Sequence, residues 1–312
     1  MNNPRQSIFP PLPLDEWEAT KETLHRYFQI AGKIRLKLMP RKNHWWYITL
    51  HPNSRGFSTG SIPYGPLFFE IQFDLLNHRL VISNSNGPDQ YFELYNGLTV
   101  AQFYTRIMKL LFDIGVEVQI LGKPYDLSDE IPFASCEKHH TYQKDYVYRF
   151  WQIMLQVDHV FKEFSGRSYS KTCPVHLYWH HMDLAVTRFS GKKAPEMKGA
   201  GIADKDAYSH EVISFGFWAG DQEVRAPAFY SYTYPSPKGL DLEPLQPDTA
   251  RWIDSNGSPM ALLMYDDIRV KDDPRESILE FLESTYLAGA KRAGWDIDGH
   301  RVPSLEDLKA GT

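Results

Sequence analysis

The chain has 312 residues, 42% hydrophobic and 14% aromatic, which is enough for one large core or for two domains of ~150 residues each. Its formal net charge of −5 carries no long block of one sign, so the basic surface that non-specific nucleic-acid binding needs is not indicated. Two cysteines are too few for a disulfide framework, and no window approaches the ~18 apolar residues of a membrane-spanning helix. The N-terminus shows no apolar signal region. We therefore expect a cytoplasmic protein, with neither nucleic acid nor a membrane as partner.

The first half of the chain reads as a helix, an antiparallel meander and a second helix. Helical spacing of apolar residues predicts the first helix from about Asp15 to Leu38, with Asp15 as its cap. The second helix begins at Thr99, with Gln102 in capping-box spacing, and ends at Gly115. Alternation of apolar and polar residues, with turn signals between the runs, predicts strands at His44–Leu50, Phe68–Leu75, Leu80–Ile82, Tyr91–Leu94 and Val116–Leu121.

The second half repeats this order of elements. A long helix is predicted from about Tyr142 to Phe164, and a last helix opens with Asp273 as cap and Pro274 at its first position. Between them, strands are predicted at Val175–Trp179, Leu184–Phe189, Glu211–Trp218, Ala228–Tyr234 and Met260–Tyr265.

We therefore predict an α+β protein of two related halves, each a long helix, an antiparallel β-meander and a closing helix. The halves are residues 14–121 and 142–296, joined by a linker at residues 122–141, with extended tails at residues 1–13 and 297–312. Local similarities, such as Gln29-Ile30 with Gln152-Ile153, favour an internal duplication. The alternative is that any two helix-flanked meanders look alike.

Several short motifs resemble one bacterial family. They are Asn43-His44-Trp45-Trp46, Ile62-Pro63-Tyr64-Gly65, Pro174-Val175-His176, the run from Asp183 to Gly191, Tyr208-Ser209-His210-Glu211-Val212 and Gly216-Phe217-Trp218. From about Leu14 to Trp295 the chain resembles the domain of unknown function 5996 family. The resemblance implies an identity but no activity, cofactor or partner, and the His180-His181 pair lies outside the pattern.

Polar residues in the predicted strands of the second half are the catalytic candidates. Pairing the two halves strand by strand aims His176 and His210 inward, where a histidine can act as acid or base. Arg188 can hold a carboxylate or phosphate, and Asp183 can orient a histidine or neutralise Arg188. A structural interpretation stands beside this one: core histidines satisfied by backbone or Tyr hydroxyls, and an Asp–Arg pair that braces two strands.

Aromatic and basic residues supply the ligand-binding candidates, which we expect to line a pocket. The structural alternatives are that Trp runs form core and that basic residues near a helix end interact with the helix dipole. The candidates are Arg35, Asn43, His44, Trp46, Tyr64, Trp179 and Trp218.

A metal site is not expected. His210 and Glu211 are adjacent on one strand and point to opposite faces, while His176 and His180 lie ~13 Å apart along an extended strand. No dinucleotide fingerprint, nucleophile elbow or zinc-type cysteine pair indicates a cofactor or a reaction.

Two function hypotheses follow. One is a small-molecule-binding protein or enzyme with an aromatic-lined pocket that uses His176, His210 and Arg188. The other is a non-enzymatic interaction or structural module, which exposed aromatic patches would support. The sequence indicates neither the reaction, the substrate nor the oligomeric state.

Overall fold

The computed structural model describes residues 8–303 and Lys309, and it confirms the predicted α+β class. Two six-stranded antiparallel sheets are each flanked by helices. In the described part of the chain, no helix is both long and apolar enough to cross a membrane. The predicted extended tails, residues 1–13 and 297–312, lie partly outside the described residues.

The chain divides into two compact units, each built from several stretches of sequence. The first contains the chain up to Gln156 together with His176–Leu184 and Trp218–Ala226. The second contains Val157–Val175, Ala185–Phe217 and the chain from Pro227 onward. The predicted linker, residues 122–141, lies within the first unit, and the internal duplication stays a prediction.

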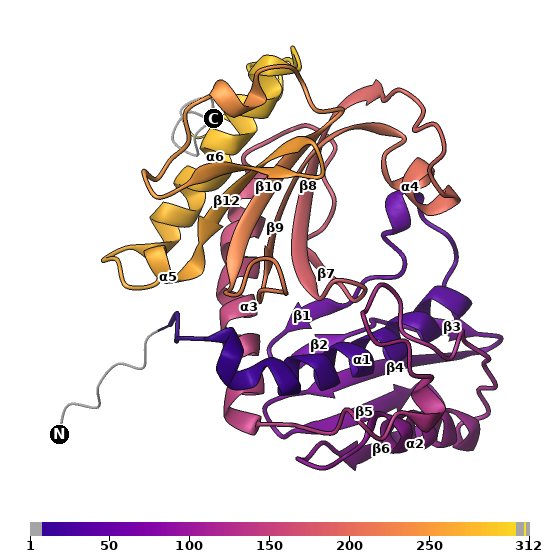
Figure 1. Ribbon diagram of the computed structural model, residues 1–312. Helices are drawn as coiled ribbons and strands as arrows, with labels where there is room; N and C mark the ends of the chain where they lie inside the picture. Colours follow the sequence, from indigo (N-terminus) through magenta and orange to yellow (C-terminus); the bar gives the residue numbers. More distant parts are fainter. Residues whose placement is uncertain (1–7, 304–308, 310–312) are drawn as a thin grey trace. The chain divides into compact units, whose positions relative to one another are not determined.

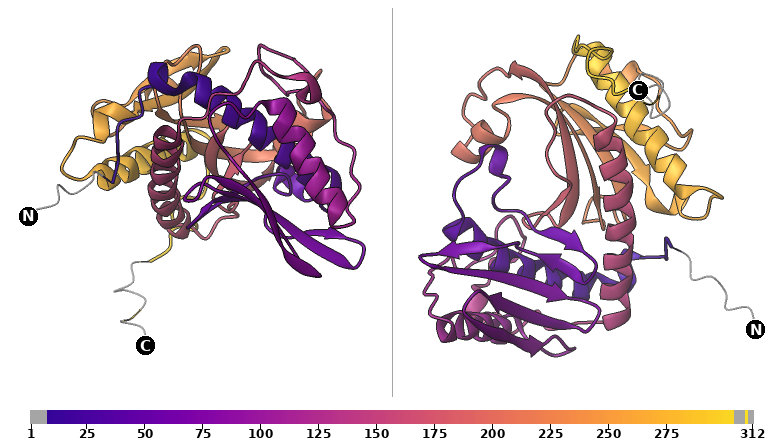
Figure 2. Two further views of the ribbon diagram at one scale, coloured as in Figure 1. Left: turned by 90° about the horizontal axis from the view of Figure 1, so that it is seen from below. Right: turned by 180° about the vertical axis from the view of Figure 1, so that it is seen from behind.

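The first unit is a sheet with two helices on one of its faces (Figure 1; Figure 2, left). Phe28 of the first helix and Phe103 of the second both contact Phe73 of the sheet, with ring centroids 4.8 and 6.1 Å apart. The strand order is β1-β2-β4-β5-β6, with β3 paired to β4. The elements are α1 (Leu14–Leu38), η1 (Asn43–Trp45), β1 (His51–Asn53), β2 (Gly56–Ser58), β3 (Ile62–Tyr64), β4 (Leu67–Asp74), β5 (Arg79–Asn84), β6 (Gly87–Glu93), α2 (Val100–Asp113), η2 (Phe133–Ser135), α3 (Lys144–Gly166), which continues into the second unit, and β7 (His176–Tyr178).

Local capping signals decide the ends of α2 but not the start of α1. Thr99 and Gln102 form the predicted capping box, which is confirmed. The predicted cap of α1 is wrong, because that helix begins at Leu14 without a side-chain cap. The Asp15 carboxylate instead accepts a hydrogen bond from Arg225 at 2.7 Å.

The predicted strand His44–Leu50 is wrong except at its last residue. The segment starts as the short turn η1 and continues as a bend, and Leu50 alone pairs, with Leu177. The Ile48 carbonyl accepts a hydrogen bond from the Trp179 indole at 2.9 Å rather than from a neighbouring strand. A tertiary contact therefore overrides the β propensity of this aromatic segment.

The predicted strand Val116–Leu121 is also wrong, since it has no strand partner among the described residues. It runs on into residues 122–126, and side chains of α1 bind the backbone of this stretch. Lys33 donates to the Leu121 carbonyl at 3.3 Å. The Gln29 amide donates to the Tyr125 carbonyl at 2.9 Å and accepts from the Tyr125 N–H at 2.7 Å.

The second unit is a sheet with α6 and the end of α3 on one face (Figure 1; Figure 2, right). Phe161 and Phe164 of α3 contact Phe229 and Phe215 of the sheet, with ring centroids 6.4 and 4.8 Å apart. The elements are β8 (Asp183–Lys193), of which Asp183 and Leu184 belong to the first unit, α4 (Ile202–Ala207), β9 (His210–Trp218), of which Trp218 belongs to the first unit, β10 (Ala228–Tyr234), η3 (Leu240–Leu242), β11 (Arg251–Ser255), β12 (Ser258–Met264), α5 (Tyr265–Ile268) and α6 (Pro274–Arg292). The strand order of the second sheet is β11-β12-β10-β9-β8-β7.

The last helix begins as its sequence predicts. The Asp273 carboxylate accepts a hydrogen bond from the Glu276 N–H, and Pro274 occupies the first helical position. The strand β11 is an element that we did not predict from the sequence, although Asn256 and Gly257, with φ of 53° and 82°, form the tight turn that joins it to β12.

Candidate functional site

Arg35 is a buried cation that no carboxylate of the described residues neutralises. It lies in the last turn of α1 with 6% of its surface exposed, and its Nη1 donates to the Thr49 carbonyl. Within residues 8–303 its Nε has no hydrogen-bond partner. Burial alone lowers its pKa to about 10, so the guanidinium keeps its charge at neutral pH. A buried charge of this kind is unfavourable until an anion pairs with it.

His176 is fully buried, and within the described part of the chain neither of its ring nitrogens has a hydrogen-bond partner. It starts β7, and burial together with the charges of His51 and Arg35 lowers its pKa to about 3. At neutral pH the ring is therefore an uncharged imidazole with one N–H donor and one acceptor nitrogen. A buried imidazole that uses neither group is unusual, because buried polar groups are normally hydrogen-bonded.

A chain of aromatic contacts joins His176 to η1. The His176 ring lies 4.8 Å from the Tyr178 ring and 6.5 Å from the His51 ring. The Tyr178 hydroxyl donates to the His44 carbonyl at 3.4 Å, and the His44 ring lies 5.3 Å from that of Trp46. His44 is buried, whereas Trp46, His51 and Tyr178 are half-buried.

Trp179 fixes β7 to α1. Its buried ring packs on Gly32, where the backbone approaches closely because glycine has no Cβ. The carbonyls of Trp179 and His180 both lie 3.0 Å from the Nε2 of His25, which therefore carries the ring proton. The predicted ligand-binding role of Trp179 stays a prediction, and its visible contacts are those of a packing residue.

The first unit thus brings together five of the predicted site residues and leaves others apart. Those that it brings together are Arg35, His44, Trp46, His176 and Trp179. Asn43 is exposed at the start of η1. The Tyr64 hydroxyl bonds the backbone of Glu117 at 3.3 Å, and the Trp218 indole donates to Asp221 at 3.1 Å.

Asp183 and His210 belong to different units. Asp183 opens β8 in the first unit and is buried. His210 starts β9 in the second unit, where it is half-buried rather than on the fully apolar face that we expected. Its Nδ1 lies 3.1 Å from the Ser209 hydroxyl. Strand parity failed here because burial does not alternate along β9: His210 and Glu211 at its start are both half-buried, and Val212–Phe217 are all buried.

Arg188 lies in the second unit and is held by aromatic rings. Its guanidinium carbon is 3.6 Å from the centre of the Phe164 ring and 4.5 Å from that of Tyr286. One Nη donates to the Phe164 carbonyl. Burial lowers its pKa to about 10, and the two ring faces stabilise the remaining charge.

Two residues of the site were missed from the sequence. His51 follows the bridging residue Leu50, and its ring faces His176. Tyr178 lies two residues after His176 on the same face of β7, so strand alternation was the signal that could have added it.

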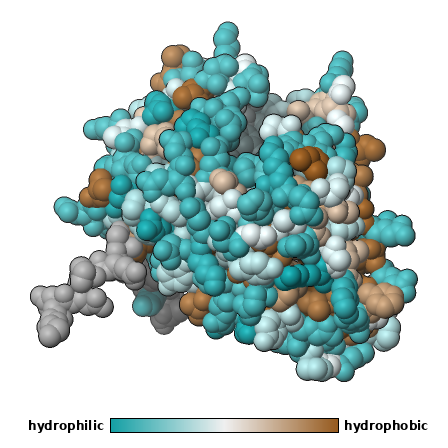
Figure 3. All heavy atoms as spheres, turned by 60° about the horizontal axis from the view of Figure 1, so that its bottom comes forward, coloured by the Kyte–Doolittle hydropathy of each residue, from teal (hydrophilic) through white to brown (hydrophobic). Residues whose placement is uncertain are grey.

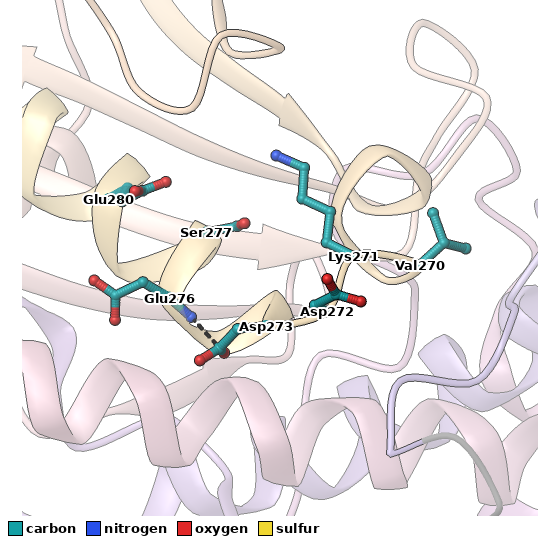
Figure 4. Close-up of a pocket in the computed structure, with 7 residues that line it drawn as sticks. All are labelled: Val270, Lys271, Asp272, Asp273, Glu276, Ser277 and Glu280. Carbon is teal, nitrogen blue, oxygen red and sulfur yellow. Dashed lines mark hydrogen bonds between the residues drawn. The ribbon is translucent and has the colours of Figure 1, made fainter.

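The second unit carries an open hollow of about 570 Å³ at the start of α6 (Figure 4). Its lining residues are Val270, Lys271, Asp272, Asp273, Glu276, Ser277 and Glu280, and their side chains point in different directions rather than toward one centre (Figure 4). The Asp273 carboxylate there caps the helix. Across residues 8–303, no group of at least 3 His, Cys, Asp or Glu side chains is arranged to hold a metal ion.

Comparison with known proteins identifies a family whose function is unknown. A family model described as a family of unknown function (DUF5996) matches residues 9–302. No curated protein and no solved structure matches the chain.

Proposed function

Because the chain belongs to the DUF5996 family, whose function is unknown, we propose a function from its own residues. The first unit binds a small organic anion on Arg35 and His176. The observation that carries the proposal is this pair: among the described residues, the buried guanidinium has no carboxylate partner and the buried imidazole has no hydrogen bond, and the two lie close enough for the charge of Arg35 to lower the pKa of His176.

Arg26 of the same helix is a buried arginine that does have a carboxylate partner, whereas Arg188 of the second unit is held by a backbone carbonyl and two aromatic rings. Arg26 is 1% exposed, and its Nη1 donates to the Glu22 carboxylate at 2.6 Å and to the Glu22 carbonyl at 2.8 Å. Arg35, two and a half turns later, has a neutral carbonyl as acceptor instead. A ligand carboxylate would give Arg35 the partner that Glu22 gives Arg26.

The protonation states also favour an anion. Among the described residues, no acidic side chain shifts the pKa of Arg35 or of His176, so the local charge is positive at neutral pH. The neutral imidazole can donate one N–H to a bound carboxylate. Whether the protein also transforms its ligand is a separate question, for which His176 as an acid or base is our prediction.

The test is a thermal-shift titration of the full chain with sodium acetate and with sodium benzoate, against sodium chloride at equal ionic strength. A ligand that binds the native state raises the melting temperature with concentration. We expect at least one carboxylate to give such a rise, and Arg35→Met to remove it.

Arg26→Met is the matched control, since it removes a buried guanidinium from the same helix but leaves the candidate site untouched. It should lower the melting temperature and keep the response to carboxylate. The proposal fails if neither carboxylate stabilises the protein beyond chloride, or if Arg35→Met and Arg26→Met respond alike.

The interaction-module alternative has weaker support in the first unit. Its three most exposed aromatic side chains among the described residues lie on separate elements: Phe68 on β4, Tyr91 on β6 and Phe112 on α2, which are 51%, 53% and 65% exposed. On the face drawn in Figure 3, hydrophobic side chains stand in small groups among hydrophilic ones. Single exposed apolar residues are normal on a protein surface and need no partner.

A further inference from the structure

The candidate site has a polar interior and an aromatic outer part. Arg35 and His176 are buried and, among the described residues, keep the Nε of the guanidinium and both ring nitrogens without hydrogen-bond partners. The rings of His51 and Tyr178 beside His176, and that of Trp46 beside His44, are half-buried. These rings connect to the interior through the measured contacts of His176 with His51 and Tyr178 and of Tyr178 with His44. The groups that can bind a charge therefore lie deeper in the protein than the rings that can contact an apolar part of a ligand.

Arg35 and His176 together carry one positive charge at neutral pH, so they can neutralise one negative charge of a ligand. Arg35 is the cation of the pair, since the depressed pKa of His176 leaves that ring neutral at pH 7. A carboxylate balances a single guanidinium and fits its planar fork. A phosphate dianion would leave one buried negative charge without a partner, which is unfavourable.

One of the outer rings, Trp46, follows a segment under backbone strain. His44 and Trp45 have φ of 54° and 62°, a region that side-chain-bearing residues rarely adopt. Contacts hold the segment there: Tyr178 donates to the His44 carbonyl, and the Thr49 hydroxyl donates to the Trp46 carbonyl at 3.3 Å.

From this arrangement we infer that the ligand is an aromatic carboxylate. The inference rests on the proposed function: the carboxylate pairs with Arg35 and His176, and the aromatic ring packs against Trp46, His51 and Tyr178. Aromatic faces prefer offset or edge-to-face contact with another ring, so an aromatic ligand gains more here than a saturated one of the same size.

Four probes test the inference on the full chain: benzoate, cyclohexanecarboxylate, the neutral isostere benzamide, and inorganic phosphate. Dissociation constants are measured by isothermal titration calorimetry or from the thermal shift. We expect benzoate to bind roughly five-fold more tightly than cyclohexanecarboxylate, which corresponds to one favourable ring contact. Benzamide and phosphate should bind far more weakly.

Variants of Trp46 give a second, independent measurement. Trp46→Leu should remove the preference for benzoate over cyclohexanecarboxylate, and Trp46→Phe should keep most of it. The control is Trp252→Leu in the second unit, which replaces a half-buried tryptophan whose indole donates to the Glu243 carbonyl at 2.9 Å, and it should leave the preference unchanged.

The outcomes separate this inference from the function on which it rests. Equal affinity for the two carboxylates, with both lost in Arg35→Met, would overturn the aromatic preference and leave anion binding in place. Benzamide binding as tightly as benzoate would overturn both, because the charge would then play no part.

Discussion

The indole ring of Trp179 lies against the α-carbon of Gly32, in the middle of α1. A Cβ built on Gly32 would come within 2.1 Å of the Trp179 Cδ1, far inside van der Waals contact. The ring cannot easily move aside, because its Nε1 donates to the Ile48 carbonyl at 2.9 Å. The pair fixes how closely β7 approaches α1 and thereby where His176 is held.

Gly32→Ala should therefore destabilise the protein although alanine favours helices. Replacement of glycine by alanine in a helix gains about 1 kcal/mol, whereas overpacking against a fixed ring costs about 1–3 kcal/mol. We expect a net loss of stability in urea unfolding followed by circular dichroism. Gly166→Ala at the end of α3 is the control, since a Cβ there meets no atom within 4 Å, and it should be neutral or slightly stabilising. A Gly32→Ala protein as stable as the parent would show that the Trp179 ring is mobile.

Gln29 holds the segment that crosses α1 by pairing both groups of its amide with the backbone of Tyr125. Gln29→Leu leaves that N–H and carbonyl without partners, which should cost about 1–3 kcal/mol for each group that stays buried. Hydrogen exchange measured by mass spectrometry should show the Tyr125 amide exchanging faster. Gln222→Leu removes an exposed glutamine of the first unit and should leave that amide protected. Unchanged exchange at Tyr125 in Gln29→Leu would contradict this role of the side chain.

Stability should fall as the pH falls below about 6.5, the ordinary pKa of a histidine. Burial lowers the pKa of His25 to about 4 and those of His176 and His180 to about 3. Between these values and 6.5 the unfolded chain binds protons that the folded chain does not. Each histidine therefore removes about 1.4 kcal/mol of unfolding free energy per pH unit as the pH drops through this range.

Urea unfolding midpoints measured from pH 7.5 to 4.5 would give this slope of the unfolding free energy against pH. His176→Phe should make the slope shallower by the share of one histidine, while His159→Phe, which replaces an exposed ring, should not change it. A slope that is the same in His176→Phe and the parent would mean that His176 is not held neutral in the folded protein.

Local signals in the sequence predict much of the fold. The Thr99 capping box, the Asp273-Pro274 helix start and the alternation along β4 act over a few residues, so the sequence shows them directly. The segment 43–50 could not be predicted in this way. Its composition favours a strand, but the carbonyls of Ile48 and Thr49 are bonded by Trp179 and Arg35, which lie far from the segment in sequence.

The candidate site shows the same division. His176 and Arg35 were each recognised from the sequence as unusual, but they were assigned to separate groups of residues. The β-bridge between Leu50 and Leu177 brings the segment after η1 next to β7, and no local sequence pattern predicts this long-range contact. His210 and Arg188 were grouped with His176 because their strands follow one another, and strand order along the chain does not define which compact unit a residue joins.

The first unit is built from three separate stretches of the chain, and this limits how it can be studied. A fragment that stops at Gln156 lacks His176–Leu184. It therefore lacks the Trp179 indole that packs against Gly32 and the His176 imidazole of the candidate site. No single protease cut or shortened gene can therefore deliver this unit by itself. Ligand discovery has to begin with the undivided polypeptide.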